Sequence, residues 1–125
     1  MNAKDLVLDF LRKEGFCPEV DERGNIVFKY QMTTYVFFSD KDDDEFFQLA
    51  MPGIYDVTED NRELVLEATN KVNQTMKVIK LIVTSDSVWV LFEILLDTTP
   101  DVKDIMPRAF SILEDGRRNF YEALQ

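Results

Sequence analysis

The chain has 125 residues, 46% of them apolar, and its 24 acidic against 14 basic side chains give a formal net charge of −10. This length suits one compact domain, so we predict a single domain over residues 1–125. Nucleic acids and anionic membranes attract clustered cations, whereas the basic pair Arg117-Arg118 here lies between acidic residues, so we expect neither as a partner.

The first predicted element is a helix over Asn2 to Glu14. It places apolar residues on one stripe, and Gly15 stands where a left-handed C-terminal residue belongs. Phe16 to Val20 is extended, and Pro18 restricts it to a sheet edge because proline has no N–H to donate. Gly24 supplies the positive φ of the turn that follows.

Three strands are then predicted from β-branched and aromatic residues: Ile26 to Tyr30, Tyr35 to Phe38 and Phe46 to Met51. Gln31-Met32 contains no glycine, so the first two segments form either a hairpin or one bent strand. Pro52-Gly53 is predicted to end the third strand.

The second half of the chain reads as helix, hairpin and helix. Thr58 is the predicted N-cap of a helix that runs to about Asn73. The strands Lys77 to Thr84 and Val88 to Leu96 form the hairpin. Thr99 caps the last helix, Pro100 is its first residue, and Pro107 either kinks this helix or marks its true start. The predicted class is α+β, an antiparallel sheet of about five strands with three helices in the order α-β-β-β-α-β-β-α.

The strand Val88 to Leu96 is apolar on both faces. Alternation puts Val88, Val90, Phe92, Ile94 and Leu96 on one side and Trp89, Leu91 and Leu95 on the other, where only Glu93 interrupts them. Either the chain's own helices cover both faces of the sheet, or a second copy or another protein covers one. We predict a protein-contact surface of Trp89, Leu91 and Leu95, with Tyr35 and Phe37 from the apolar strand Tyr35 to Phe38.

Catalytic chemistry finds little support in the residues. Histidine is absent, and there is no glycine-rich phosphate loop or dinucleotide fingerprint, so we predict no enzyme, no catalytic residues and no cofactor. Asp40, Asp42 and Asp44 alternate like calcium ligands, but Glu45 and Met51 stand where such a loop needs glycine and glutamate, so no metal site is predicted. The single cysteine, Cys17, excludes an intrachain disulfide, and with no signal-peptide pattern we expect a cytoplasmic protein.

The arrangement resembles the bacterial YbjN-like family, described as sensory-transduction regulators with a fold like that of type III secretion chaperones. The resemblance is carried by Glu14-Gly15-Phe16, Asn25 to Tyr30, Thr34 to Phe37 and, most specifically, Ala68 to Asn73 leading into Lys77 to Leu81. It implies a non-enzymatic fold, often dimeric, that holds or regulates other proteins along hydrophobic grooves and sheet edges.

We therefore predict a non-enzymatic protein-binding module, chaperone-like or regulatory, that acts as a homodimer and binds a client or regulatory protein. The alternative is a small-molecule or ion-sensing regulatory domain, with the loop Asp40 to Asp44 or an internal apolar pocket as its site.

Overall fold

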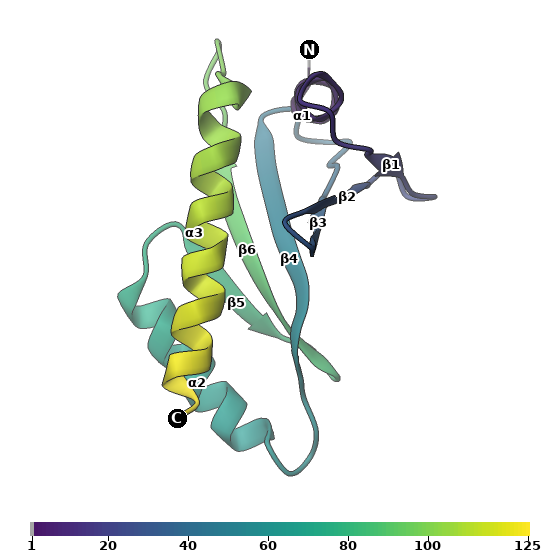
Figure 1. Ribbon diagram of the computed structural model, residues 1–125. Coiled ribbons are helices and arrows are strands. Elements are labelled where there is room, and N and C mark those ends of the chain that lie inside the picture. Colours follow the sequence, from purple (N-terminus) through teal and green to yellow (C-terminus); the bar gives the residue numbers. More distant parts are fainter. Residues whose placement is uncertain (1) are drawn as a thin grey trace.

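The computed structural model describes residues 2–125, which form three helices and a six-stranded antiparallel sheet (Figure 1). The helices are α1 (Ala3–Lys13), α2 (Arg62–Thr75) and α3 (Val102–Ala123). The strands are β1 (Glu19–Val20), β2 (Ile26–Tyr30), β3 (Thr33–Phe37), β4 (Phe46–Asp56), β5 (Ile79–Val83) and β6 (Ser87–Leu95). Their order across the sheet is β1-β2-β3-β4-β6-β5. The predicted α+β class is confirmed, with one strand more than expected.

The helices and one face of the sheet share a single core. Apolar residues on that face are buried, and the row Ile26, Phe37, Leu49, Phe92 and Ile79 crosses five strands in register. The long helix α3 runs across this face, and its Phe110 stacks on Tyr30 with 4.4 Å between ring centroids (Figure 1). Of the alternatives left open for the second face, coverage by the chain's own helices does not hold for residues 2–125, because the buried residues of α1, α2 and α3 all belong to this one core.

The approach of α3 to the sheet depends on one glycine. A Cβ added to Gly116 would lie 2.6 Å from Cδ1 of Ile79 and 3.0 Å from Cγ1 of Val90. A side chain at this position would therefore push α3 away from β5 and β6.

The first helix and the first turns follow the sequence closely. Asn2 caps α1 by accepting a hydrogen bond at Oδ1 from the N–H of Asp5 at 2.9 Å, and Gly15 follows the helix with a φ of +86°. β1 is a two-residue edge strand immediately after Pro18, paired with β2 through Glu19–Val27 and Val20–Ile26. This short pairing is the additional strand.

β2 and β3 form a hairpin, which excludes the single bent strand. Its turn residues, Gln31 and Met32, both have positive φ, +49° and +65°. Glycine or asparagine normally fills such positions because a Cβ is crowded there.

β4 is longer than predicted, because Pro52-Gly53 does not end it. The strand continues to Asp56 through an irregularity between Met51 and Tyr55. The pairing of β4 with β3 ends near Ala50, so no β3 residue needs a hydrogen bond from the N–H that Pro52 lacks. On its other side, β4 stays paired with β6 as far as Asp56.

The starts of α2 and α3 also differ from prediction. Asn61, not Thr58, is the N-cap of α2, and the two residues hydrogen-bond to each other in the turn before the helix. α3 is capped by Asp101, whose Oδ1 accepts from the N–H of Asp104 at 3.3 Å, so Thr99 and Pro100 precede the helix. Pro107 lies inside α3.

Candidate functional site

The sheet face opposite the helices, called the open face below, has an apolar centre. Its central row crosses the sheet in register and consists of Val27, Val36, Ala50, Leu91 and Lys80. Ala50 and Leu91 are 0% and 4% exposed, although α1, α2 and α3 pack on the opposite face of the sheet. Wet faces of antiparallel sheets normally carry polar residues, so this composition is typical of a contact surface.

Trp89 lies on the open face and is held in place. Its ring stacks on Phe38 with 6.0 Å between centroids, and its Nε1 donates to Oγ of Ser87 at 3.0 Å. Phe38 itself is fixed just beyond β3, where its N–H donates to the carbonyl of Gln48 at 3.0 Å. A large aromatic pair is therefore oriented before any partner arrives.

Next to this pair is a groove of about 630 Å³, called the open-face groove. It is lined by Val20, Asp21, Glu22, Arg23, Asn25, Val27, Val36, Phe38 and Trp89. Val27 also lines a second depression of about 490 Å³, beside Cys17, Lys29 and Thr34.

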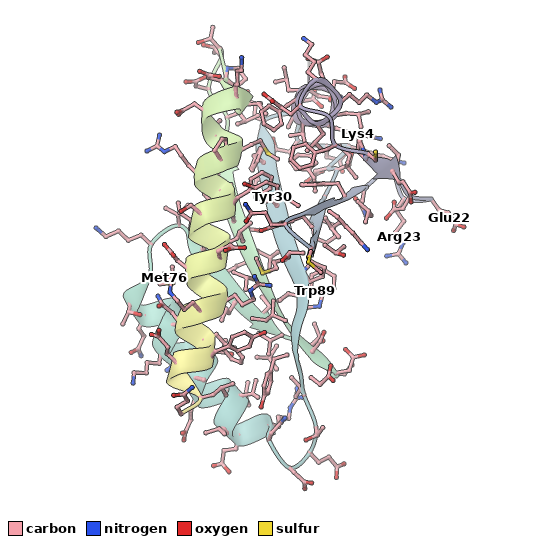
Figure 2. All side chains as sticks on the ribbon, viewed as in Figure 1. Lys4, Glu22, Arg23, Tyr30, Met76 and Trp89 are labelled. Carbon is pink, nitrogen blue, oxygen red and sulfur yellow. The ribbon has the colours of Figure 1, made fainter. Side chains whose placement is uncertain are left out.

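The turn between β1 and β2 forms one rim of the groove. Oδ1 of Asp21 accepts from the N–H groups of Arg23 and Asn25, both at 2.9 Å, and Gly24 has a φ of +84°. Asn25 Oδ1 accepts from the N–H of Ser39 at 3.0 Å, which ties this turn to the end of β3. Figure 2 shows Glu22 and Arg23 projecting from the turn, away from α3.

The polar part of the open face is internally paired. Glu93 bonds Lys80 Nζ at 3.0 Å through one carboxylate oxygen and accepts from Nε2 of Gln48 at 2.5 Å through the other. The one charge that interrupts the apolar side of β6 is thus neutralised by its neighbours.

The predicted contact residues separate into two groups. Trp89 lines the groove, Leu91 lies buried on the open face, and Leu95 is 70% exposed near the far end of β6. Tyr35 and Phe37 are 0% and 1% exposed on the helix-covered face, so they belong to the core and leave the candidate surface. The open-face groove is lined instead by Val36 and Phe38, whose side chains alternate with those of Tyr35 and Phe37 and so lie on the other face of the sheet.

A family model described as "T3SS (YopN, CesT) and YbjN peptide-binding chaperone 1", TY-Chap1, matches residues 2–116. The chain belongs to this family. The predicted resemblance is thereby confirmed, and TY-Chap1 membership supports a protein-binding role rather than catalysis.

Structural comparison adds support for the fold alone. The protein is similar to a solved structure described as "Crystal structure of an uncharacterized protein from Methanothermobacter thermautotrophicus". The TM-score is 0.68 at 15% identity, over 98% of this chain and 96% of the other. No curated protein matches the sequence.

In this TY-Chap1 chain, the loop Asp40 to Asp44 and Cys17 are not part of the lining of the open-face groove. Within residues 2–125, no group of three or more Cys, Asp or Glu side chains is placed to hold a metal ion. Oδ1 of Asp40 accepts from the N–H of Asp42 at 2.9 Å, and Oδ1 of Asp43 accepts from the N–H of Glu45 at 3.1 Å, so these carboxylates stabilise their own loop. Cys17 is exposed.

One titratable group lies away from the groove in an unusual environment. The Tyr35 hydroxyl is buried and has no hydrogen-bond partner among residues 2–125. Burial, with a smaller contribution from Glu114, raises the pKa of Tyr35 to about 12. None of the helices in the described part of the chain has the length and apolar character needed to cross a membrane.

Proposed function

We propose that this protein binds an extended segment of a client protein in the open-face groove, in the manner of a chaperone or a regulatory binding module. The main support for this proposal is the stacked pair of Trp89 and Phe38, which lies on an apolar sheet face and lines the groove. A prealigned aromatic in an apolar depression is the usual anchor of a protein interface. The family description as peptide-binding supports the same reading.

Strand addition at the β5 edge is disfavoured as the binding mode. Asn73 of α2 already occupies both backbone hydrogen-bonding groups of Leu81 at this edge of the sheet. The opposite edge, β1, is only two residues long. A face-on contact with side-chain anchors therefore fits the molecule better than edge pairing through β5.

The test uses a library of synthetic random decapeptides passed over immobilised protein, with the retained peptides sequenced and one resynthesised with a fluorescent label. We expect retained peptides to be rich in apolar residues. Trp89→Ala should weaken binding of the labelled peptide by about tenfold or more, measured by fluorescence polarisation. Leu66→Ala is the matched control, because Leu66 is a 48% exposed apolar residue on α2.

Both variants must keep the wild-type melting temperature within a few degrees, since neither side chain is fully buried. Equal affinity of wild type and Trp89→Ala would place the binding site elsewhere. Loss of binding in Leu66→Ala instead would assign it to α2.

A second copy of the chain is the other partner that the open face fits, and we retain the homodimer as part of the proposal. The apolar residues on this face, including the 70% exposed Leu95, support it. Light scattering after size exclusion decides the point, because a monomer has a mass of 14.6 kDa. A clean monomer with intact peptide binding removes the dimer and leaves the client. The cytoplasmic location stays a prediction.

A further inference from the structure

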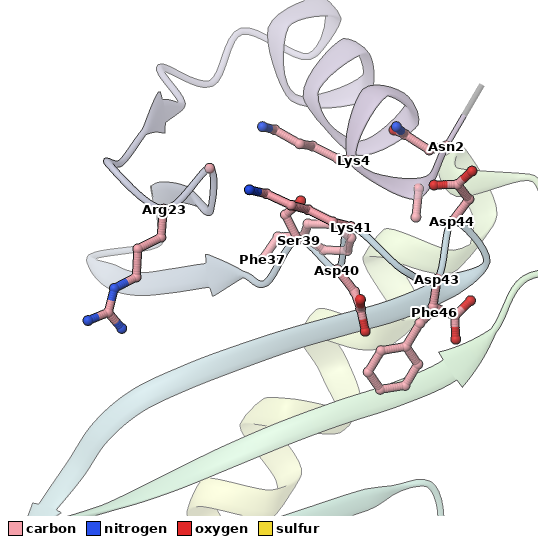
Figure 3. A pocket seen from close by; sticks show the side chains of 12 residues that line it. Asn2, Lys4, Arg23, Phe37, Ser39, Asp40, Lys41, Asp43, Asp44 and Phe46 are labelled. Carbon is pink, nitrogen blue, oxygen red and sulfur yellow. The ribbon is translucent and has the colours of Figure 1, made fainter.

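Three cations from distant parts of the sequence line one pocket. Lys4 comes from the start of α1, Arg23 from the turn after β1 and Lys41 from the loop before β4, and together they line a hollow of about 320 Å³. Lys4 Nζ lies close to the turn, since a Cβ added to Gly24 would be 3.2 Å from it. Figure 3 shows the side chains of Lys4 and Lys41 extending in the same direction, towards the turn that carries Arg23. We call this hollow the basic pocket.

The three cations of this pocket form no ion pair in the described part of the chain, although the sequence has ten more acidic than basic side chains. Five of the eleven other cations form ion pairs, namely Lys13, Lys80, Arg108, Arg117 and Arg118. Among residues 2–125, no carboxylate forms an ion pair with Lys4, Arg23 or Lys41.

Aspartates also line the basic pocket, but on its other side. Asp40 and Asp43 each use one carboxylate oxygen to accept a backbone N–H of their own loop. Figure 3 shows Asp40, Asp43 and Asp44 on the side away from the lysine ends. On one side of the pocket the ammonium groups of Lys4 and Lys41 lie together, while the guanidinium of Arg23 points away from them (Figure 3). A carboxylate that enters beside the two lysines is attracted by both.

The basic pocket adjoins the open-face groove. Arg23 lines both hollows, and Asn25 and Ser39, which are hydrogen-bonded to each other, lie at the junction. A peptide that occupies both hollows would contact Trp89 with one residue and Lys4 or Lys41 with another.

We propose that the basic pocket binds a carboxylate of the client peptide, placed a few residues from the apolar side chain that enters the open-face groove. This inference rests on the proposed function and adds the charge pattern of the segment that is recognised. Charge-assisted hydrogen bonds from lysine and arginine are the ordinary means of holding a carboxylate. Because the rest of the protein is acidic, the pocket selects one carboxylate in a segment that is otherwise neutral or basic.

The carboxylate has two possible sources, an Asp or Glu side chain and the C-terminus of the client. The random decapeptide library is therefore made twice, once with free and once with amidated C-termini. Enrichment of Asp or Glu near an apolar residue in both libraries identifies a side chain. Retention confined to the free library identifies the terminal carboxylate.

The deciding variant is Lys4→Gln/Lys41→Gln, and its control is Lys71→Gln/Lys77→Gln, which removes the same charge from exposed positions on α2 and the loop after it. We expect the first variant to keep the apolar preference, to lose the carboxylate preference and to bind a wild-type-selected peptide about tenfold more weakly. The control should behave like wild type. Lys41→Gln alone, at an exposed position, provides the same readout with several-fold weaker binding if Lys4 proves necessary for folding.

A carboxylate preference that persists in Lys4→Gln/Lys41→Gln, or is absent from wild type while apolar selection remains, overturns this inference and leaves the proposed function standing. Failure of wild type to retain any peptide overturns the proposed function itself. The two failures are therefore distinguishable.

Discussion

The side-chain amide of Asn73 pairs with both backbone groups of Leu81. Its Nδ2 donates to the Leu81 carbonyl at 3.1 Å, and its Oδ1 accepts from the Leu81 N–H at 2.8 Å. Leu81 lies in the middle of β5, the edge strand of the sheet, so this contact both joins α2 to the sheet and occupies an edge that another chain would otherwise pair with.

Replacing Asn73 should therefore cost stability and expose the edge. Asn73→Ala is expected to lower the free energy of unfolding by about 1–2 kcal/mol, because two partly buried hydrogen bonds are lost. Urea denaturation measures this, and aggregation of the variant at high concentration should rise. Asn70→Ala, at an exposed position on the same helix, is the control and should change stability little. Equal effects of the two substitutions would contradict this role of Asn73.

Gly116 should be intolerant of even a methyl group. Gly116→Ala gains about 1 kcal/mol of helix propensity but meets Ile79 and Val90, and overpacking of this kind costs about 1–3 kcal/mol. We expect net destabilisation of about 1 kcal/mol. Ile79→Val removes the Cδ1 atom that is nearest the new methyl group, so Gly116→Ala should cost less in that background. A double-mutant cycle with no coupling would show that α3 shifts instead.

The β2–β3 turn should be open to stabilisation. Gln31 and Met32 both have positive φ, which L-residues other than asparagine and aspartate adopt at a cost of about 1–2 kcal/mol each. Gln31→Asn/Met32→Gly is therefore expected to raise the free energy of unfolding by about 1–2 kcal/mol, measured by denaturation in urea. Gln31→Ala/Met32→Ala is the control and should give no gain. If the alanine pair stabilises equally, backbone conformation is not the cause.

Tyr35 predicts a loss of stability in alkali. In the unfolded chain its pKa is 10.0, and in the native protein burial raises the pKa to about 12. Below pH 10 both states keep the proton, whereas between pH 10 and 12 the unfolded chain loses it first, so the free energy of unfolding falls as the pH rises. Wild type should lose about 1 kcal/mol more than Tyr35→Phe between pH 9 and pH 11. Identical losses in the two proteins would argue against a buried, protonated hydroxyl.

The helices and strands were largely predictable because their patterns are local in the sequence. The candidate site depends on which sheet face the helices cover, and this is decided by contacts between distant residues. Alternation in β6 identified two apolar faces, but it could not say which face the helices cover. In the segment Tyr35 to Phe38 the side chains on both faces are apolar. Phe110 of α3 packs against Tyr35 with 5.0 Å between ring centroids, and this contact places Tyr35 and Phe37 in the core. The contact residues Val36 and Phe38 follow only once that face is known.

Other misses have similarly non-local causes. Pro52 is tolerated inside β4 because β3 does not pair with that part of the strand, a fact of sheet topology that the residues around Pro52 do not encode. The spacing of Lys4, Arg23 and Lys41 in the sequence predicts no shared site, and only the fold places them around one pocket. A helix end near Asn73 was predicted, but the hydrogen bonds of Asn73 to Leu81 depend on how β5 packs beside α2.

The central claim, that the open-face groove receives the client, has a direct optical test because Trp89 is the only tryptophan. A peptide retained from the random library is titrated into wild-type protein while the tryptophan emission is recorded. Our account predicts a saturable change in emission, with a midpoint that matches the Kd from fluorescence polarisation. Binding seen by polarisation with no change in Trp89 emission would contradict it.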